Sequence, residues 1–244
     1  MSNRAKKNAV NSNETKPIAL VYRGPAAECD GNECSYALKT LLENATLWNF
    51  EVEYVGPDEE KDVDEGLLDL DVVLYAQPGG GGDEKAAFEN ELKDYAQDVR
   101  NFVCNGGRYL GICMGAYLAG DSGEFPGYDL GLKVGQYIET PGATVKNEDD
   151  AIVQVAWRGK TRWMYFQDGT YFKPDICVNG KTILAYYTNG KVAAMIQPYY
   201  KGWIGVSGPH PEADLSWYEE ANLKYPGPTT DLGLDLIDTL MMQI

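Results

Sequence analysis

The sequence is poor in positive charge and in long apolar runs. Only 21 lysines and arginines stand against 37 aspartates and glutamates among 244 residues, which gives a formal net charge of −16 at pH 7. Affinity for nucleic acid comes mostly from lysine and arginine side chains that neutralise phosphates, so we expect no nucleic-acid partner. No run approaches the ~18 apolar residues of a membrane span, and we expect no membrane partner either.

Histidine and cysteine are also scarce. The single histidine is His210, so any reaction that needs an imidazole near neutral pH depends on it. The five cysteines are an odd number spread over a long chain, unlike the dense, even set of a small secreted disulfide scaffold. No apolar run follows the basic residues near the N-terminus, as it would in an export signal. We therefore expect a reducing, cytoplasmic location.

The first half of the sequence alternates between apolar strands and amphipathic helices. Residues 1–16 are polar and without periodicity, which predicts a disordered segment, and 17–244 are expected to form a single domain. Alternation of strand and helix predicts parallel pairing with right-handed crossovers, and hence a doubly wound α/β sheet. The expected strands are 18–22, 50–55, 72–76 and 109–113, and the expected helices are 33–44, 83–104 and 114–119.

The second half is rich in short strands separated by turn residues. Asn189-Gly190 is a strong signal for a two-residue β-hairpin turn, which predicts antiparallel pairing here. The fold class expected from both halves is α/β, a doubly wound and mostly parallel sheet with an antiparallel, strand-rich extension. The expected strands are 152–157, 163–166, 182–188, 191–198 and 203–207, followed by a closing helix at 231–242.

A cysteine lies between two glycines where the strand at 109–113 runs directly into a helix. In the sequence Gly111-Ile112-Cys113-Met114-Gly115 the glycines permit a sharp turn, which is the pattern of a nucleophile elbow. The helix N-terminus would stabilise a thiolate there. This pattern predicts that Cys113 is a reactive or ligand-facing thiol, and the alternative is an ordinary small buried residue at a strand end.

The one imidazole follows the last expected strand of the sheet. His210 is in a Gly-Pro-His-Pro-Glu segment, and Glu212 lies two residues further on, where its carboxylate can orient the ring. Cysteine, histidine and a carboxylate together have the logic of a catalytic triad. The alternative is a lone histidine that is only a structural part of a proline-rich loop.

Four glycines follow the third expected strand and open a helix. Their backbone N–H groups could face an anion or a developing oxyanion, although a run of glycines can also be a flexible turn. The ending of a phosphate-binding loop is missing, because Asp83-Glu84 follows. We therefore interpret Gly79, Gly80 and Gly81, together with the N–H of Met114, as a candidate oxyanion and substrate-binding element.

Taken in order, these segments resemble the class I glutamine amidotransferase superfamily. The similarity is greatest to the amidotransferase-like N-terminal domain of biotin-protein ligases and spans about residues 17–222. The segments that carry it are Leu20-Val21-Tyr22-Arg23-Gly24-Pro25, Gln77-Pro78-Gly79-Gly80, the sequence from Gly111 to Gly120, and the sequence from Gly205 to Glu212.

The resemblance implies a flavodoxin-like fold, with Cys113 as nucleophile, His210 as base and Glu212 as the orienting acid. It also implies oxyanion donors at Gly80 and Met114, and no cofactor. Glutamine-using members usually continue the elbow with Gly-His-Gln, whereas this sequence has Gly115-Ala116-Tyr117 there, which makes Tyr117 a candidate substrate-binding residue.

We accordingly expect a small-molecule amide as substrate, processed through a thioester. No synthetase or ligase domain follows the site, so a separate synthetase or ligase is a candidate partner. The alternative is a non-catalytic ligand-binding or regulatory module that has kept the scaffold. A weaker alternative, a chaperone or glyoxalase-like relative of the same fold, needs an acid beside the thiol that the sequence does not reveal.

Other features leave alternatives open. Cys29 and Cys34 have a spacing that fits a small disulfide or a metal site; because no second cysteine pair or nearby histidine completes a zinc site, we expect no metal there. Cys104 and Cys177 are typical of small buried residues. The aromatic segment 162–172 is either a hairpin packed on the core or a substrate-facing loop. The acidic runs 58–60 and 148–150 are expected to be solvated loops.

Overall fold

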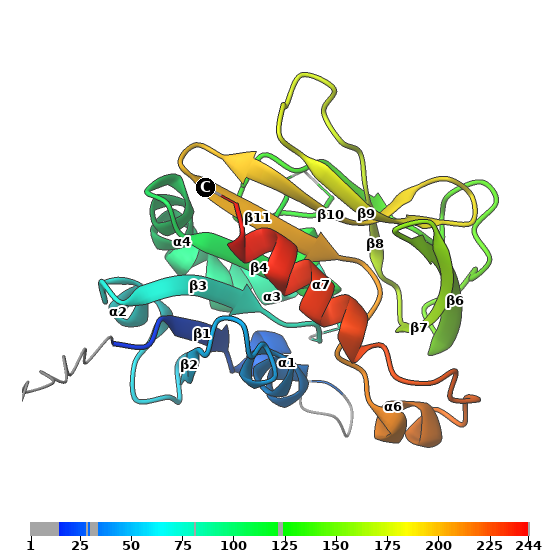
Figure 1. Cartoon of the computed structure of the whole chain (residues 1–244), viewed down its shortest axis with the longest axis horizontal. Coiled ribbons are helices and arrows are strands. Elements are labelled where there is room, and N and C mark those ends of the chain that lie inside the picture. Colours follow the sequence, from blue (N-terminus) through cyan, green and yellow to red (C-terminus); the bar gives the residue numbers. More distant parts are fainter. Residues whose placement is uncertain (1–14, 28, 30–33, 81, 122–123, 244) are drawn as a thin grey trace, which may run out of the picture.

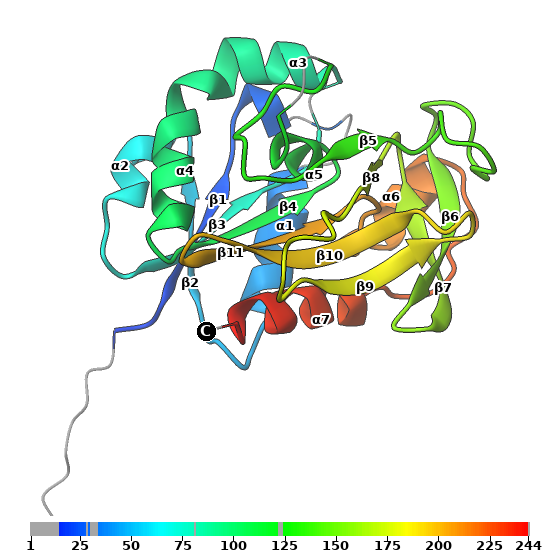
Figure 2. The ribbon, with the colours of Figure 1, turned by 90° about the horizontal axis from the view of Figure 1, so that it is seen from above.

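The computed structural model describes residues 15–27, 29, 34–80, 82–121 and 124–243. Most of the predicted disordered segment, residues 1–14, lies outside the described residues. Within the described chain, one mixed sheet of eleven strands is covered by helices on both faces, as Figures 1 and 2 show from two directions. The expected α/β class, with a mostly parallel sheet and an antiparallel extension, is confirmed.

The parallel part of the sheet positions the candidate site residues predicted from the sequence. Its strand order is β2-β1-β3-β4-β11, and all four neighbouring pairs are parallel. Every residue of β1 is buried, as its unbroken apolar run predicts. Because parallel strands end at the same edge, the segments after them lie close together. The strands are β1 (Ile18–Tyr22), β2 (Glu51–Val55), β3 (Val72–Gln77), β4 (Arg108–Ile112) and β11 (Gly202–Ser207).

The antiparallel part extends the sheet beyond β11. The order continues through β10, β9, β6 and β7, with two short strands, β5 and β8, beside this path. The Asn189-Gly190 turn joins β9 to β10, with Gly190 at φ +82° and the Lys191 N–H donating to Asn189 Oδ1 at 3.1 Å, so the predicted hairpin is confirmed. The strands are β5 (Val134–Gln136), β6 (Ala151–Trp157), β7 (Lys160–Phe166), β8 (Thr170–Phe172), β9 (Thr182–Tyr187) and β10 (Val192–Tyr199).

Helices pack on the two faces of the sheet around separate groups of apolar side chains. α1 (Cys34–Glu43) and α7 (Thr230–Met241) contact each other and cover one face. α2 (Val63–Leu67), α4 (Ala96–Cys104) and α5 (Met114–Leu118) cover the opposite face. The alternating inward and outward residues of the strands supply both groups, as expected for a sheet buried on both sides. None of the helices in the described chain is long and apolar enough to cross a membrane.

The helix expected at 83–104 is interrupted. α3 (Glu84–Ala87) is followed by a π turn (Phe88–Leu92), a 3-10 turn (Lys93–Tyr95) and then α4. The apolar side stays continuous through the interruption, so the periodicity of the sequence does not reveal it. Contacts with distant residues hold it, since the Tyr95 hydroxyl donates to Asp62 Oδ2 at 2.7 Å and the Phe88 ring packs edge-on against Tyr128.

Candidate functional site

Cys113 occupies the single residue between β4 and α5. Its φ of +51° and ψ of −109° are a conformation that costs a side-chain-bearing residue about 1–3 kcal/mol. Both flanking glycines are required by the backbone around them. A Cβ at Gly111 would lie 2.3 Å from the Gly115 carbonyl oxygen, and one at Gly115 would lie 2.0 Å from the Gln77 carbonyl oxygen. The Gly-x-Cys-x-Gly sequence is thus the one that fits this turn.

Buried tyrosines form hydrogen bonds with residues around this turn. The Tyr109 hydroxyl donates to the Gly115 carbonyl at 2.6 Å. Tyr75 and Tyr128 both donate to Gln77 Oε1, at 2.7 and 3.0 Å. Because fully buried hydrogen bonds of this kind leave few alternative arrangements, they fix the end of β3 against the start of α5.

His210 and Glu212 follow β11 at the same edge of the sheet. His210 Nδ1 lies 2.8 Å from Glu212 Oε1, and the two residues are only 3% and 7% exposed. The backbone N–H of His210 donates to the Tyr165 carbonyl at 3.0 Å, and the rings of Tyr165 and Trp217 pack against the imidazole. With Nδ1 donating to the carboxylate, Nε2 is left for another partner. The packing role of Trp217 was not foreseen from the sequence.

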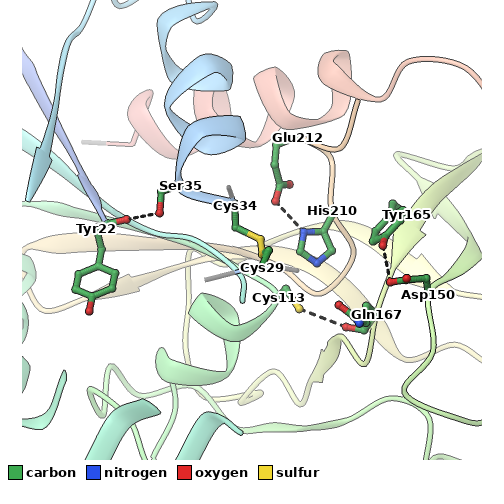
Figure 3. The surroundings of a disulfide bond; sticks show 10 residues. All are labelled: Tyr22, Cys29, Cys34, Ser35, Cys113, Asp150, Tyr165, Gln167, His210 and Glu212. Atoms are coloured by element: carbon green, nitrogen blue, oxygen red, sulfur yellow. Dashed lines mark hydrogen bonds and ion pairs between the residues drawn. A yellow bond between two sulfur atoms is a disulfide. The ribbon is translucent and has the colours of Figure 1, made fainter. Parts of the chain in front are cut away.

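Cys113 and His210 meet across Gly79. A Cβ at Gly79 would lie 2.8 Å from His210 Cε1 and 3.2 Å from Cys113 Cβ. No side chain can therefore stand between the thiol and the imidazole at this point. Figure 3 shows the two side chains close together, with Glu212 behind the ring. The Cys113 thiol donates to the Gln167 carbonyl at 3.4 Å.

The environment of His210 favours its charged form. Burial lowers the pKa of the ring, but the Glu212 carboxylate and the Cys113 sulfur raise it by more, to about 10. The imidazole is therefore protonated at neutral pH. A protonated imidazole that is hydrogen-bonded to a carboxylate and lies beside a sulfur is the arrangement used by thiol nucleophiles.

These groups open into a cleft of about 1060 Å³ at the carboxyl ends of the parallel strands. Cys113, Met114, Gly80 and His210 line it. Glu212 lies behind the imidazole rather than on the wall, and Gly79 lies between thiol and ring. Gly81, predicted as part of the same element, lies outside the described residues.

The segment after β7 forms one wall of the cleft. Gln167 and Asp168 line it, and Gln136 Nε2 donates to Asp168 Oδ2 at 2.7 Å. Tyr117 is buried, and its hydroxyl donates to the Asp168 carbonyl at 3.0 Å, so its side chain supports this wall from below. The aromatic segment 162–172 packs on the core, as the first of its two alternatives predicted, since Met164, Phe166 and Phe172 are buried; its Gln-Asp turn lines the cleft.

Carboxylates dominate the cleft wall. Among the described residues that line it, the one lysine or arginine is Arg23, which is paired with Glu59. Burial, and then neighbouring carboxylates, raise the pKa of Glu84 to about 7; burial likewise raises that of Asp168 to about 6. The acidic runs 58–60 and 148–150 lie in loops, as expected, and four of their residues also line the cleft. The acidic lining residues are Asp58, Glu59, Glu84, Glu148, Asp150, Asp168 and Glu220.

Cys29 and Cys34 form a disulfide, which settles the alternatives left open by their spacing. Both residues line the cleft, and a Cβ at Gly79 would lie 3.6 Å from Cys34 Sγ. The prediction that Cys177 is buried was wrong, because it is exposed in the loop before β9. Among the described side chains, no group of three or more histidine, cysteine, aspartate and glutamate residues is placed to hold a metal ion.

Solved structures with the same arrangement of strands and helices define the class of fold. A glutamine amidotransferase shares 17% identity at a TM-score of 0.54, over 84% of this chain and 99% of its own. A glutamine amidotransferase from Thermotoga maritima shares 16% identity at a TM-score of 0.57, over 93% of this chain and 96% of its own. The fold is therefore that of the glutamine amidotransferases.

The sequence itself places the chain more narrowly. Residues 18–140 match the family model described as biotin-protein ligase, N terminal, and this match covers half of the chain. The chain belongs to that family. No protein with a curated description matches it.

Proposed function

We propose that this protein is a cysteine-dependent amidotransferase-like hydrolase that cleaves an amide through a thioester. The observation that carries the proposal is the meeting of Cys113 and His210 across Gly79, with Glu212 hydrogen-bonded behind the ring. A nucleophile, a base and an orienting acid in this relation form a catalytic triad. The turn at Cys113 then serves as a nucleophile elbow, which lifts the sulfur above the ends of the strands.

In the proposed reaction the Cys113 sulfur attacks the amide carbonyl carbon, and the carbonyl oxygen becomes an oxyanion. The backbone N–H groups of Gly80 and Met114, both at the cleft, are the proposed donors to that oxyanion. His210 gives a proton to the leaving nitrogen as the C–N bond breaks, which releases ammonia or an amine and leaves a thioester. His210 then accepts a proton from water, whose oxygen attacks the thioester and frees the acid and the thiol.

The residues that follow Cys113 bear on which amide is the substrate. Ala116-Tyr117 stands where glutamine-using members carry His-Gln. Tyr117 acts in this proposal through the Asp168 carbonyl, as a residue that positions the cleft wall. We therefore propose a small-molecule amide as the substrate and do not specify glutamine. A separate synthetase or ligase that receives the ammonia, and a cytoplasmic location, remain parts of the proposal.

The direct test measures ammonia release from glutamine and from a panel of simple primary amides. We expect activity that Cys113→Ala abolishes and that Cys177→Ala, at an exposed thiol elsewhere, leaves unchanged. Iodoacetamide near pH 6 should also alkylate Cys113 faster than Cys104 or Cys177, because His210 stabilises its thiolate. Equal alkylation rates at the three thiols would contradict an activated nucleophile.

One observation favours the non-catalytic alternative. The Cys113 thiol lies 3.4 Å from the Gln167 carbonyl oxygen, and this hydrogen bond needs a protonated sulfur rather than the thiolate of the proposed nucleophile. A ligand-binding module would keep that contact. It would be supported if amides protected Cys113 from alkylation while no ammonia appeared with any of them.

A further inference from the structure

The Cys29–Cys34 disulfide lies in the same cleft as the candidate nucleophile, and the proposed amide chemistry does not use it. We propose that Cys113 exchanges with this disulfide, so that the three cysteines form a thiol–disulfide exchange switch that turns the site off and on. The inference concerns the thiol and the disulfide alone. It does not depend on the protein hydrolysing amides.

Cys113 and Cys34 both lie close to Gly79. The position of a Cβ at Gly79 is 3.2 Å from Cys113 Cβ and 3.6 Å from Cys34 Sγ. These two distances place Cys34 Sγ within two van der Waals contacts of the Cys113 side chain. Figure 3 shows the disulfide beside Cys113, on the side that also faces His210.

The chemistry of the site favours exchange. Thiol–disulfide exchange begins with a thiolate, and the Cys113 sulfur lies beside the positively charged His210. Of the other two free cysteines, Cys104 is half-buried at the end of α4 and Cys177 is exposed before β9, and neither lines the cleft. Cys113 is thus the thiol that is placed to attack.

In the proposed step the Cys113 thiolate attacks Cys34 Sγ in line with the existing bond. A bond forms between the sulfurs of Cys113 and Cys34, and the Cys29–Cys34 bond breaks. Its electron pair leaves on Cys29 Sγ, which takes a proton from water. Cys29 is the better leaving group because it is half-exposed, whereas Cys34 is fully buried at the start of α1. One disulfide and one thiol are present before and after, so no external oxidant is needed.

The exchanged form has no free sulfur at position 113 and is inactive in any chemistry that Cys113 performs. Attack of the Cys29 thiolate on Cys34 Sγ restores the original pairing and frees Cys113. A dithiol reductant would instead leave all three cysteines as thiols, with Cys113 available. Exchange therefore makes the availability of the Cys113 thiol dependent on the state of the cleft disulfide.

The test maps disulfides in the full-length protein without measuring activity. The protein is held between pH 6 and 9, quenched in acid, alkylated with N-ethylmaleimide under denaturing conditions and digested with trypsin without reduction. Cys29 and Cys34 fall in one tryptic peptide, residues 24–39, and Cys113 falls in another, residues 109–133. We expect a cross-linked pair of these peptides with Cys29 alkylated.

A variant makes the test independent of the equilibrium position in the wild type. In Cys29→Ser, Cys34 is left as a thiol, and treatment with oxidised glutathione should link it to Cys113. Cys177→Ser is the matched control and should behave as the wild type. The proposal fails if the wild type keeps Cys29–Cys34 intact with Cys113 fully alkylated at every pH and the Cys29→Ser protein forms no 34–113 link. Absence of ammonia release would leave these results unaffected and would count only against the proposed hydrolase.

Discussion

At the scale of single residues, the site depends on the absence of a side chain at position 79. In Gly79→Ala the new methyl would lie 2.8 Å from His210 Cε1 and 3.2 Å from Cys113 Cβ, so one of the two groups must move. We expect the iodoacetamide reactivity of Cys113 and any amide hydrolysis to fall at least tenfold, because a displacement near 1 Å disrupts catalytic geometry.

Gly82→Ala is the control for this substitution. No atom lies within 4 Å of its Cβ, and its left-handed φ of +67° costs about 1 kcal/mol of stability without moving the thiol or the ring. The assignment of the site would be wrong if both variants retained the reactivity of the wild type.

The Glu212 carboxylate should make stability depend on pH through His210. The pKa of the ring is raised from 6.5 to about 10 in the folded protein, so the stabilisation is complete below pH 6.5 and disappears as the pH rises through about 10. Glu212→Gln removes the carboxylate that raises the pKa of His210 most. The decrease in stability of this variant as the pH rises should therefore be smaller than that of the wild type. Urea unfolding at pH 6, 8 and 10 measures it as the difference between the two proteins. A difference that is independent of pH would contradict a charged His210.

At the scale of elements, the junction between β4 and α5 leaves no room for a side chain at its glycines. A methyl at Gly115 would lie 2.0 Å from the Gln77 carbonyl oxygen, and both groups belong to backbone that is held by other hydrogen bonds. We expect Gly115→Ala to lower the free energy of unfolding by about 3 kcal/mol, the upper part of the range for overpacked cores. Denaturant unfolding gives this value directly, and a change below about 1 kcal/mol would mean that the turn can relax.

The strands and the elbow sequence were predictable because their causes are local. An apolar run such as residues 18–22 has one stable place in a parallel sheet, and two glycines around Cys113 have few other uses. The contact of Gln167 with the thiol uses a backbone carbonyl, which no side-chain pattern encodes. The acidic lining also went unforeseen, because Glu84 and Glu148 come together only through the folding of distant segments.

At the scale of the whole molecule, the charge of the cleft should select what reaches Cys113. Its acidic wall adds to a net charge of −16, and together they should attract cations and repel anions. We expect a trimethylammonium methanethiosulfonate to modify Cys113 faster than the sulfonate analogue, with a rate ratio on the order of ten times that at exposed Cys177.

Two changes of condition check this electrostatic origin. The ratio should shrink in about 0.5 M salt, which shortens the Debye length to a few ångströms. It should grow as the pH rises through about 6 and 7, where Asp168 and Glu84 lose their protons. A ratio at Cys113 equal to that at Cys177 under all conditions would contradict the role assigned to the acidic wall.

The cleft disulfide bears on where such a protein can function. Disulfides persist in oxidising compartments and are reduced in the cytosol, so the Cys29–Cys34 bond weighs against the predicted cytoplasmic location. The disulfide and a cytoplasmic location are compatible only if the Cys29–Cys34 bond breaks and re-forms, as the proposed exchange with Cys113 allows. The location stays a prediction, and the redox state of this pair in cells would decide it.

The buried tyrosines around the turn at Cys113 also provide an absorbance signal that reports whether the protein is folded. Burial raises the pKa of Tyr75, Tyr109 and Tyr117 well above 10, so their phenols stay un-ionised in alkali as long as the fold is intact. Their contribution to the ultraviolet absorbance of phenolate would then appear as a late, second stage, when the fold opens. The second stage therefore reports the unfolding of the buried tyrosine packing around Cys113, and its measurement needs no label or substrate.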